Sequence, residues 1–186
     1  MRRTPLHRLA AFAGLALVAC GPMPVGNPAV PEPAKAVDLQ RYLGRWYEMA
    51  RYENRFERDC AGVTAEYALR PDGLISVTNT CRKGGPAGPA EVARGRARLT
   101  GDAQGAKLKV SFLGPFFGDY WVLDRAEDYS WSIVGEGSGR YLWVLTRDPT
   151  PSAEVREGLI ARVASLGYDT KMLHMTVQPP SEPPPT

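Results

Sequence analysis

The sequence predicts an all-β fold: an eight-stranded up-and-down antiparallel barrel with one C-terminal α-helix packed outside it. Three observations favour this fold. Short β-rich runs recur along the chain, turn residues separate them, and a single late segment has helical spacing. A parallel α/β sheet is disfavoured because it needs a helix between successive strands. The 186 residues suffice for one domain with a buried core.

The strand candidates combine alternation with turn signals. In residues 63–69, apolar side chains alternate with Thr64, Glu66 and Ala68. Residues 71–73 read Pro-Asp-Gly, a turn in which Pro fixes φ and Gly accepts a positive φ. Residues 74–80 then continue as the second strand of a hairpin. The remaining strand candidates are residues 46–52, 92–99, 107–113, 120–124, 129–134, 141–146 and 172–177.

One late segment has the signals of a helix. Thr150 is a capping residue, and Pro151 suits the first helical position. Gly167 ends the segment. Near-helical spacing relates the apolar residues Val155, Leu159, Val163 and Leu166.

The chain begins with the pattern of a secretory signal. Basic residues at positions 2, 3 and 8 precede an apolar run at residues 9–18, too short to span a bilayer comfortably. Residues 17–20 read Leu-Val-Ala-Cys, which resembles the bacterial lipobox, so Cys20 is the expected acylated first residue after removal of residues 1–19. The alternative is an ordinary signal peptide with an incidental Cys. By the same resemblance, Gly21 favours export to the outer membrane, with the protein facing the periplasm.

Proline-rich segments flank the predicted folded body. Residues 20–37 comprise the acylated Cys and a segment with five prolines and no apolar periodicity, which we interpret as an extended tether. Residues 179–186 contain five prolines and are expected to be disordered. The folded body is therefore residues 38–178.

The charge balance argues against a nucleic-acid partner. The whole chain has 23 Lys and Arg residues against 20 Asp and Glu residues. Residues 1–19 hold three Arg and no acidic residue, so their removal leaves 20 of each sign. Nucleic-acid binding depends on neutralising phosphates, and a neutral body gives no reason to expect it.

The residues available for catalysis are few. His174 is the one histidine outside the leader, so neither a metal site nor an activated nucleophile has support. We expect no catalytic residue, no metal and no cofactor. Glu48 has two interpretations: a polar anchor for a ligand head group, or a buried carboxylate paired with an Arg or Tyr of the barrel. The second is favoured.

Cys60 and Cys81 form an even pair in an exported chain, where disulfides persist. The hairpin turn brings them within about one residue of direct opposition. The sequence therefore predicts a disulfide between them.

Several motifs resemble those of the lipocalins, and most closely the bacterial outer-membrane lipoproteins of that family. Gly44-Arg45-Trp46 resembles the first family signature, Asp128-Tyr129 the second, and Leu145-Thr146-Arg147 the third. Residues 112–118 resemble a stretch typical of the bacterial members. The resemblance implies that Trp46 closes one end of the barrel and that Arg147 packs across its indole.

If Trp46 faces inward, alternation assigns the interior of the barrel. Gly95 and Ala97 are small and leave volume. The candidates for polar groups inside the barrel are Tyr67, Tyr120 and Asn79. A solid core is the competing interpretation. The expected ligand-binding residues are Val63, Ala65, Tyr67, Ile75, Val77, Ala97, Val110, Phe112, Tyr120, Val122 and Trp143.

The resemblance implies a membrane-anchored protein that binds a fatty acid, a lysophospholipid or a similar apolar molecule, for lipid storage or transport in the cell envelope. Two alternatives remain open: a structural or chaperone-like envelope lipoprotein without a small ligand, and a lipid-isomerising enzyme on the same scaffold. The apolar stretch 113–117 suits contact with a membrane or with a second copy, so a homodimer also remains open.

Overall fold

The computed structural model of this chain describes residues 24–179. The predicted leader, Cys20 and residues 180–186 lie outside the described residues. Within the described range the elements are, in chain order, α1 (Leu39–Tyr42), β1 (Gly44–Tyr52), β2 (Cys60–Leu69), β3 (Ile75–Lys83), β4 (Ala90–Leu99), β5 (Lys107–Leu113), β6 (Phe116–Arg125), β7 (Trp131–Gly135), β8 (Leu142–Thr146), α2 (Ala153–Ser165), the 3₁₀ helix η1 (Thr170–Met172) and β9 (Leu173–Met175).

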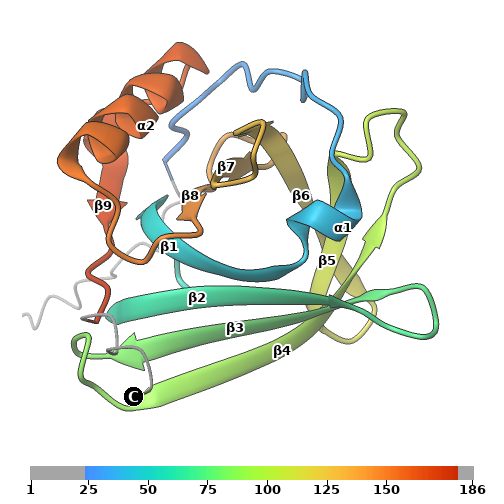
Figure 1. The fold of residues 1–186 in the computed structure, drawn as a ribbon, viewed down its shortest axis with the longest axis horizontal. Coiled ribbons are helices and arrows are strands. Elements are labelled where there is room, and N and C mark those ends of the chain that lie inside the picture. The colour runs from blue at the N-terminus through green and yellow to red at the C-terminus, as the bar shows by residue number, and fades with distance from the viewer. Residues whose placement is uncertain (1–23, 180–186) are drawn as a thin grey trace, which may run out of the picture.

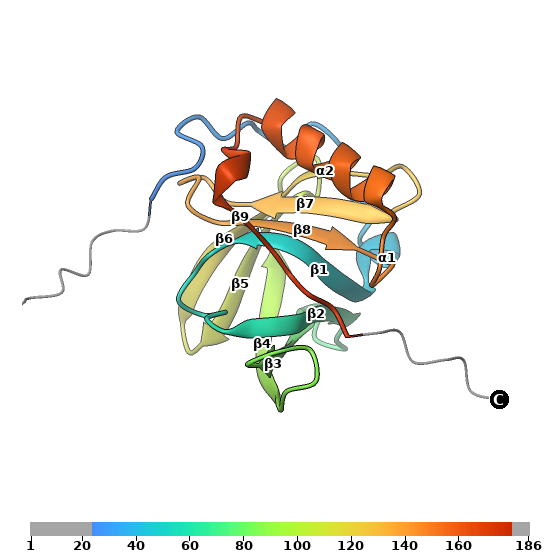
Figure 2. The same cartoon turned by 90° about the vertical axis from the view of Figure 1, so that its left-hand side faces the viewer.

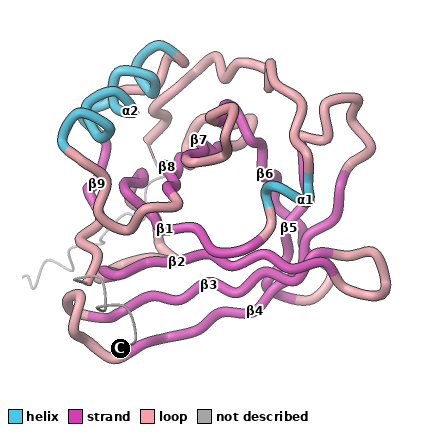
Figure 3. Tube along the Cα trace, in the orientation of Figure 1, coloured by secondary structure: helices cyan, strands magenta, loops and turns pink. Residues whose placement is uncertain are grey.

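Strands β1 to β8 close into an antiparallel barrel, as the sequence predicts (Figures 1 and 3). From β2 to β8, each strand pairs with the next one along the chain, and β1 pairs with both β2 and β8. The short strand β9 pairs with the end of β1, on the side of β1 opposite β8. Six of the nine expected strands are longer than predicted at one or both ends. The last is shorter than expected because η1 occupies its start.

Because successive strands run in opposite directions, the connections alternate between the two ends of the barrel. Figure 2 shows α1 on the right, whereas the described chain begins, in blue, at the left. The end that carries α1 also carries turns 70–74, 100–106 and 126–130, and we call it the closed end. The opposite end, which we call the mouth, carries loops 53–59, 84–89, 114–115 and 136–141.

The short helix α1 covers the closed end, and no pattern in the sequence predicts it. Asp38 caps it, since its carboxylate accepts hydrogen bonds from the backbone N–H groups of Gln40 and Arg41. Four residues are too few to show a periodic signal. The helix places Tyr42 inside the barrel, where it is 2% exposed.

Helix α2 packs against the outer face of the barrel wall. Its cap is Ser152, whose hydroxyl accepts from the N–H of Val155, so the predicted start at Thr150 is wrong by two residues. Leu159 and Val163 are buried, as their spacing suggests, but Val155 is 43% exposed. A second core forms between helix and wall, and includes Met49, Ala50, Tyr52, Leu123, Ile133, Leu142, Val144, Leu159, Val163 and Tyr168.

The segment before α1 lies against the barrel over most of its length. Gly26 and Asn27 both donate their backbone N–H groups to the carbonyl of Gly139 at the mouth, at 3.0 and 3.2 Å. Val37 donates to the carbonyl of Gln104 at the closed end, at 2.7 Å. This arrangement differs from the expected extended tether, because the residues from Gly26 onward are hydrogen-bonded to the body.

In residues 24–179, the structure contains no helix that is both long and apolar enough to cross a membrane.

Candidate functional site

The interior of the barrel is lined by one contiguous cluster of side chains. The register aligns Trp46 with Ala65, and Tyr67 with Val77, so the inward positions of neighbouring strands meet. Nine of the eleven expected ligand-binding residues belong to this cluster: Ala65, Tyr67, Ile75, Val77, Ala97, Val110, Tyr120, Val122 and Trp143.

Several residues of the interior cluster were not among the expected ligand-binding residues. Leu108 alternates with Val110 on β5 and lies on the same inward face, a signal that was present in the sequence. Val134 and Leu145 belong to strands whose neighbouring positions are also apolar, so alternation does not mark their inward faces. Tyr42 comes from α1 and not from a strand.

Two expected interior residues are not part of the interior cluster. Val63 is 5% exposed but is not part of the interior cluster, and it lies where the pairing of β2 with β3 is irregular. Phe112 is 44% exposed and lies where the β5–β6 register shifts between Val110 and Leu113.

Gly95 does not leave the open volume that its size suggested. A Cβ atom added to Gly95 would lie 2.8 Å from the Phe112 ring and 2.6 Å from the carbonyl oxygen of Ser111. The ring of Phe112 therefore occupies the space beside Gly95. Only glycine permits this approach of β4 to β5.

Trp46 and Arg147 form the expected contact at the closed end. The guanidinium carbon of Arg147 lies 3.7 Å from the centroid of the Trp46 ring, and Trp46 is fully buried. The indole N–H of Trp46 donates to the carbonyl of Tyr42 at 2.8 Å, which ties the indole to α1. The cation is therefore held over a buried ring.

The second signature also contributes to the closed end. Tyr129 is 4% exposed, and the guanidinium groups of Arg41 and Arg125 each lie 4.4 Å from its ring centroid. Its hydroxyl accepts the backbone N–H of Asp38, the cap of α1. Asp128 accepts the N–H of Ser130 and shapes the turn in which Tyr129 adopts a φ of +63°.

Three tyrosine hydroxyl groups form a hydrogen-bonded group inside the barrel. The Tyr120 hydroxyl lies 2.8 Å from that of Tyr42 and 3.0 Å from that of Tyr67. Ser132 extends the group at 3.1 Å from Tyr42. Burial raises the pKa of Tyr42 to about 12 and holds those of Tyr67 and Tyr120 above their usual range. These hydroxyls therefore stay protonated and mostly bond one another.

A β-bulge brings a second polar group to the interior. The β1–β8 register shifts between Glu48 and Ala50, so that Glu48 pairs with Leu145 and Arg51 with Trp143. Leu145 and Trp143 both belong to the interior cluster, and the bulge thus turns Glu48 and Arg51 to the same face.

Glu48 and Arg51 are each 1% exposed, and Arg51 Nη1 donates to Glu48 Oε1 at 2.9 Å. The pairing interpretation of Glu48 is the one that the geometry matches. Burial, together with the charge of Glu57, raises the pKa of Glu48 to about 8, against the opposing effect of Arg51. Among the described residues, Glu48 Oε2, Arg51 Nε and the side-chain oxygen of Asn79 have no hydrogen-bond partner.

An aromatic series leads from the mouth into the barrel. Phe56 stacks on Tyr141 at 6.2 Å between ring centroids, and Tyr141 stacks on Trp143 at 5.8 Å. The indole N–H of Trp143 donates to Glu57 at 2.9 Å. Arg51 also donates to the Glu57 carbonyl, at 3.0 Å. The loop 53–59 is thereby fixed to the inner wall.

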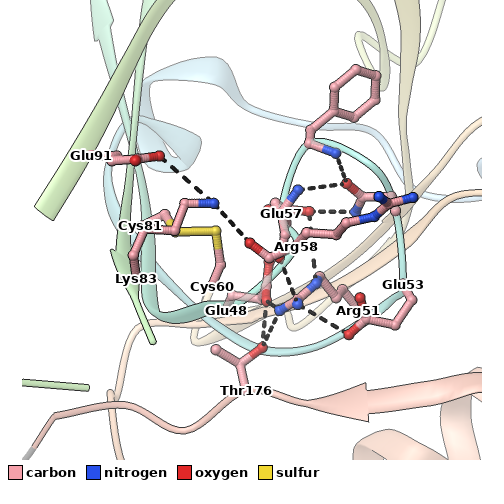
Figure 4. Close-up of a disulfide and its surroundings, with 12 residues drawn as sticks. Glu48, Arg51, Glu53, Glu57, Arg58, Cys60, Cys81, Lys83, Glu91 and Thr176 are labelled. Atoms are coloured by element: carbon pink, nitrogen blue, oxygen red, sulfur yellow. Dashed lines mark hydrogen bonds and ion pairs between the residues drawn. A yellow bond between two sulfur atoms is a disulfide. The ribbon is translucent and has the colours of Figure 1, made fainter. Parts of the chain in front are cut away.

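The Cys60–Cys81 disulfide is confirmed, with its Cα atoms 5.3 Å apart (Figure 4). The register differs from the expected near-opposition, because Cys60 pairs with Lys83 and the disulfide runs diagonally. The irregularity between Ala61 and Thr64 allows this offset. Lys83 Nζ also donates to the carbonyl of Arg58, so two links join the mouth loop to β3.

A small depression lies outside the barrel, beside the start of α2. Its volume of about 160 Å³ is below the range of roughly 300–1,000 Å³ typical of ligand pockets. Its lining residues include Met49, Thr150, Arg156 and Thr176, and none of them was expected at the site. The depression is therefore a weaker candidate than the interior. In residues 24–179, the acidic, His and Cys side chains form no group of three suited to a metal ion.

Comparisons with known proteins bear on this architecture. The family model described as "Lipocalin-like domain" matches residues 37–178. The chain is 39% identical over 183 residues to "Outer membrane lipoprotein Blc" of Escherichia coli (strain K12), covering 97% of this chain and 100% of that protein. It is 38% identical over 162 residues to "Temperature-induced lipocalin-1" of Arabidopsis thaliana, covering 83% of this chain and 85% of that protein.

Solved structures share the architecture at low sequence identity. Insecticyanin from the tobacco hornworm Manduca sexta aligns with a TM-score of 0.62 at 19% identity, covering 86% of this chain and 88% of that one. Lobster apocrustacyanin A1 aligns with a TM-score of 0.59 at 17% identity, covering 82% and 92%. The signatures, the closed barrel with its outer helix and the match over most of the chain agree: this protein belongs to the lipocalin family.

Proposed function

We propose that the barrel binds one single-chain apolar molecule, such as a fatty acid or a lysophospholipid, and stores or transports it at the bacterial outer membrane. The observation that carries this proposal is the combination of an apolar interior wall with unpaired polar atoms. Buried polar atoms rarely lack partners, and those of Glu48, Arg51 and Asn79 suit the polar head of a bound molecule or ordered water.

The proposal includes an acyl anchor at Cys20, which lies outside the described residues. The leader pattern and the relatives named outer membrane lipoproteins support it. A Cys20→Ser variant should be released from the membrane fraction or stay unprocessed. Processing at the same site with retained acylation, measured by intact mass, contradicts this anchor.

A solid barrel without a small ligand is the second candidate function. The Phe112 ring beside Gly95 favours it, because that ring takes space that a ligand would use. A thiol-dependent isomerase has less support, since Cys60 and Cys81 are bonded to each other and no free thiol remains in residues 24–179.

A titration with fatty acids of increasing length separates the two candidates. Each buried CH₂ contributes about 0.8 kcal/mol before ordering costs, so affinity should rise up to about fourfold per CH₂ and then level off. Binding to the purified mature protein is measured by calorimetry. Failure of every length to bind favours the solid barrel.

A pair of matched variants locates the ligand. Ala97 is 1% exposed in the interior cluster, whereas Ala68 is exposed on the same half of the barrel wall. Ala97→Trp should weaken binding at least tenfold, while Ala68→Trp should leave it unchanged. Overpacking at Ala97 costs about 1–3 kcal/mol, so folding is checked by thermal unfolding. Equal affinity in the two variants places the ligand outside the interior.

A further inference from the structure

Among residues 24–179, the three most exposed large apolar side chains all lie at the mouth of the barrel. Phe56 in loop 53–59 is 63% exposed, while Leu113 and Phe116 flank the β5–β6 turn at 76% and 75%. We call these three residues the rim. Beside the closed-end turns, the most exposed large apolar side chain is that of Leu69, which is 50% exposed. Exposure of large apolar groups at one end of a protein marks an interaction surface.

Each part of the rim has an arginine beside it. The Arg55 guanidinium lies 5.0 Å from the Phe56 ring centroid. Arg96 donates to the carbonyl of Gly114, at the turn between Leu113 and Phe116, at 3.0 Å. A guanidinium next to an exposed apolar side chain suits the boundary of a lipid layer, where the apolar group enters the acyl region and the cation meets phosphates.

The segment that follows Cys20 first contacts the barrel at the mouth. Gly26 is bonded to Gly139, two positions before Tyr141 of the aromatic series at the mouth. Gly26 follows Cys20 by six positions, which span at most about 20 Å when extended. Strand β2 alone has ten residues and is about 33 Å long, so a lipid at Cys20 cannot easily place the closed end on the membrane.

We infer that the mouth rests on the lipid surface, with the rim in contact with the acyl region and the arginines at the phosphates. The inference deepens the proposed function and rests on acylation of Cys20. In this orientation the barrel interior opens towards the bilayer, and an apolar ligand moves between them without crossing the full depth of water.

Two labelled variants test the orientation. Phe116→Cys and Leu69→Cys each receive an environment-sensitive fluorophore, since both side chains are exposed but lie at opposite ends of the barrel. The acylated full chain is reconstituted into vesicles of phosphatidylethanolamine and phosphatidylglycerol, with quencher groups on the acyl chains. Non-reducing peptide mapping checks that Cys60–Cys81 is intact in both.

We expect quenching at position 116 to exceed that at position 69 at least threefold. Equal quenching, or greater quenching at position 69, overturns the inference. If the label at position 116 is shielded from water in the absence of vesicles, and the protein has twice the mass of one chain, the rim contacts a second copy. That result also overturns the inference. Intact mass and the fatty acid titration are recorded on the same samples. If intact mass shows that Cys20 is not acylated, the inference is overturned with its premise. If no fatty acid binds but position 116 is quenched, the orientation stands and only the proposed ligand is contradicted.

Discussion

The guanidinium of Arg147 covers the ring of Trp46 and bonds at the same time to the backbone of α1 and of its junction with β1. Nη2 donates to the carbonyls of Arg41, Tyr42 and Leu43, at 3.0, 3.1 and 2.8 Å, and Nη1 donates to that of Arg45. A single planar cation thus joins β8 to the segment that closes the barrel, and its geometry makes lysine a poor replacement.

Arg147→Lys should destabilise the protein by roughly 1–3 kcal/mol, because an ammonium cannot stack on the indole and reach several carbonyls at once. Urea unfolding of the variant and the wild-type protein measures the difference. Arg94→Lys, at an exposed position of β4, serves as a control for loss of a guanidinium. An Arg147→Lys protein as stable as the wild type contradicts the role assigned to this contact.

Trp46→Ala should cost about 3–5 kcal/mol, since the side chain is fully buried and its loss leaves a cavity. Trp131→Ala should cost less, because Trp131 is only partly buried on the outer side of the barrel. In the folded fraction of Trp46→Ala, the free energy of ligand binding should change by less than the free energy of unfolding does. Unchanged thermal unfolding with lost binding would instead make Trp46 a ligand residue.

Removal of the disulfide in the double variant Cys60→Ser/Cys81→Ser should cost about 3 kcal/mol, the amount expected for closing a loop across a separation of 21 residues. The double variant avoids the free thiol that a single substitution leaves. A reductant should destabilise the wild-type protein by a similar amount and leave the double variant unaffected. If it destabilises both equally, the effect does not come from this bond.

The raised pKa of Glu48 predicts a stability that falls with rising pH. The folded protein retains a proton that the unfolded chain releases near pH 4.5, so the contribution is full below that pH and is lost as pH rises through about 8. Glu48→Gln should flatten this dependence between pH 5 and pH 8, measured by denaturant unfolding. A slope unchanged by Glu48→Gln would show that another group sets the pH dependence.

Alternation and turn chemistry predict the barrel, because most strands keep a strict period of two over a buried face. The same rule fails at bulges. It cannot show that Glu48 and Arg51 share a face, since three positions separate them and the bulge lies between them. Bulges depend on partner strands, and one sequence carries no signal for them.

The N-cap of α2 and the packing of the proline-rich segment were also hard to predict from the sequence. Thr150 and Ser152 are both good capping residues, and only the packing of α2 selects the second. The proline-rich segment has no periodicity, yet Asn27 is buried through contacts with Gly139 and Leu166 that are distant in sequence. Long-range contacts of this kind lie outside the reach of local patterns.

The covalent link between β2 and β3 also affects how the protein survives proteolysis. The turn Pro71–Gly73 is exposed and lies within the loop that Cys60 and Cys81 close. A protease that nicks this turn leaves both fragments in one molecule, with the strand ladder on either side of the cut still paired. Such a nicked form runs as a single species until it is reduced, and only then separates into two chains.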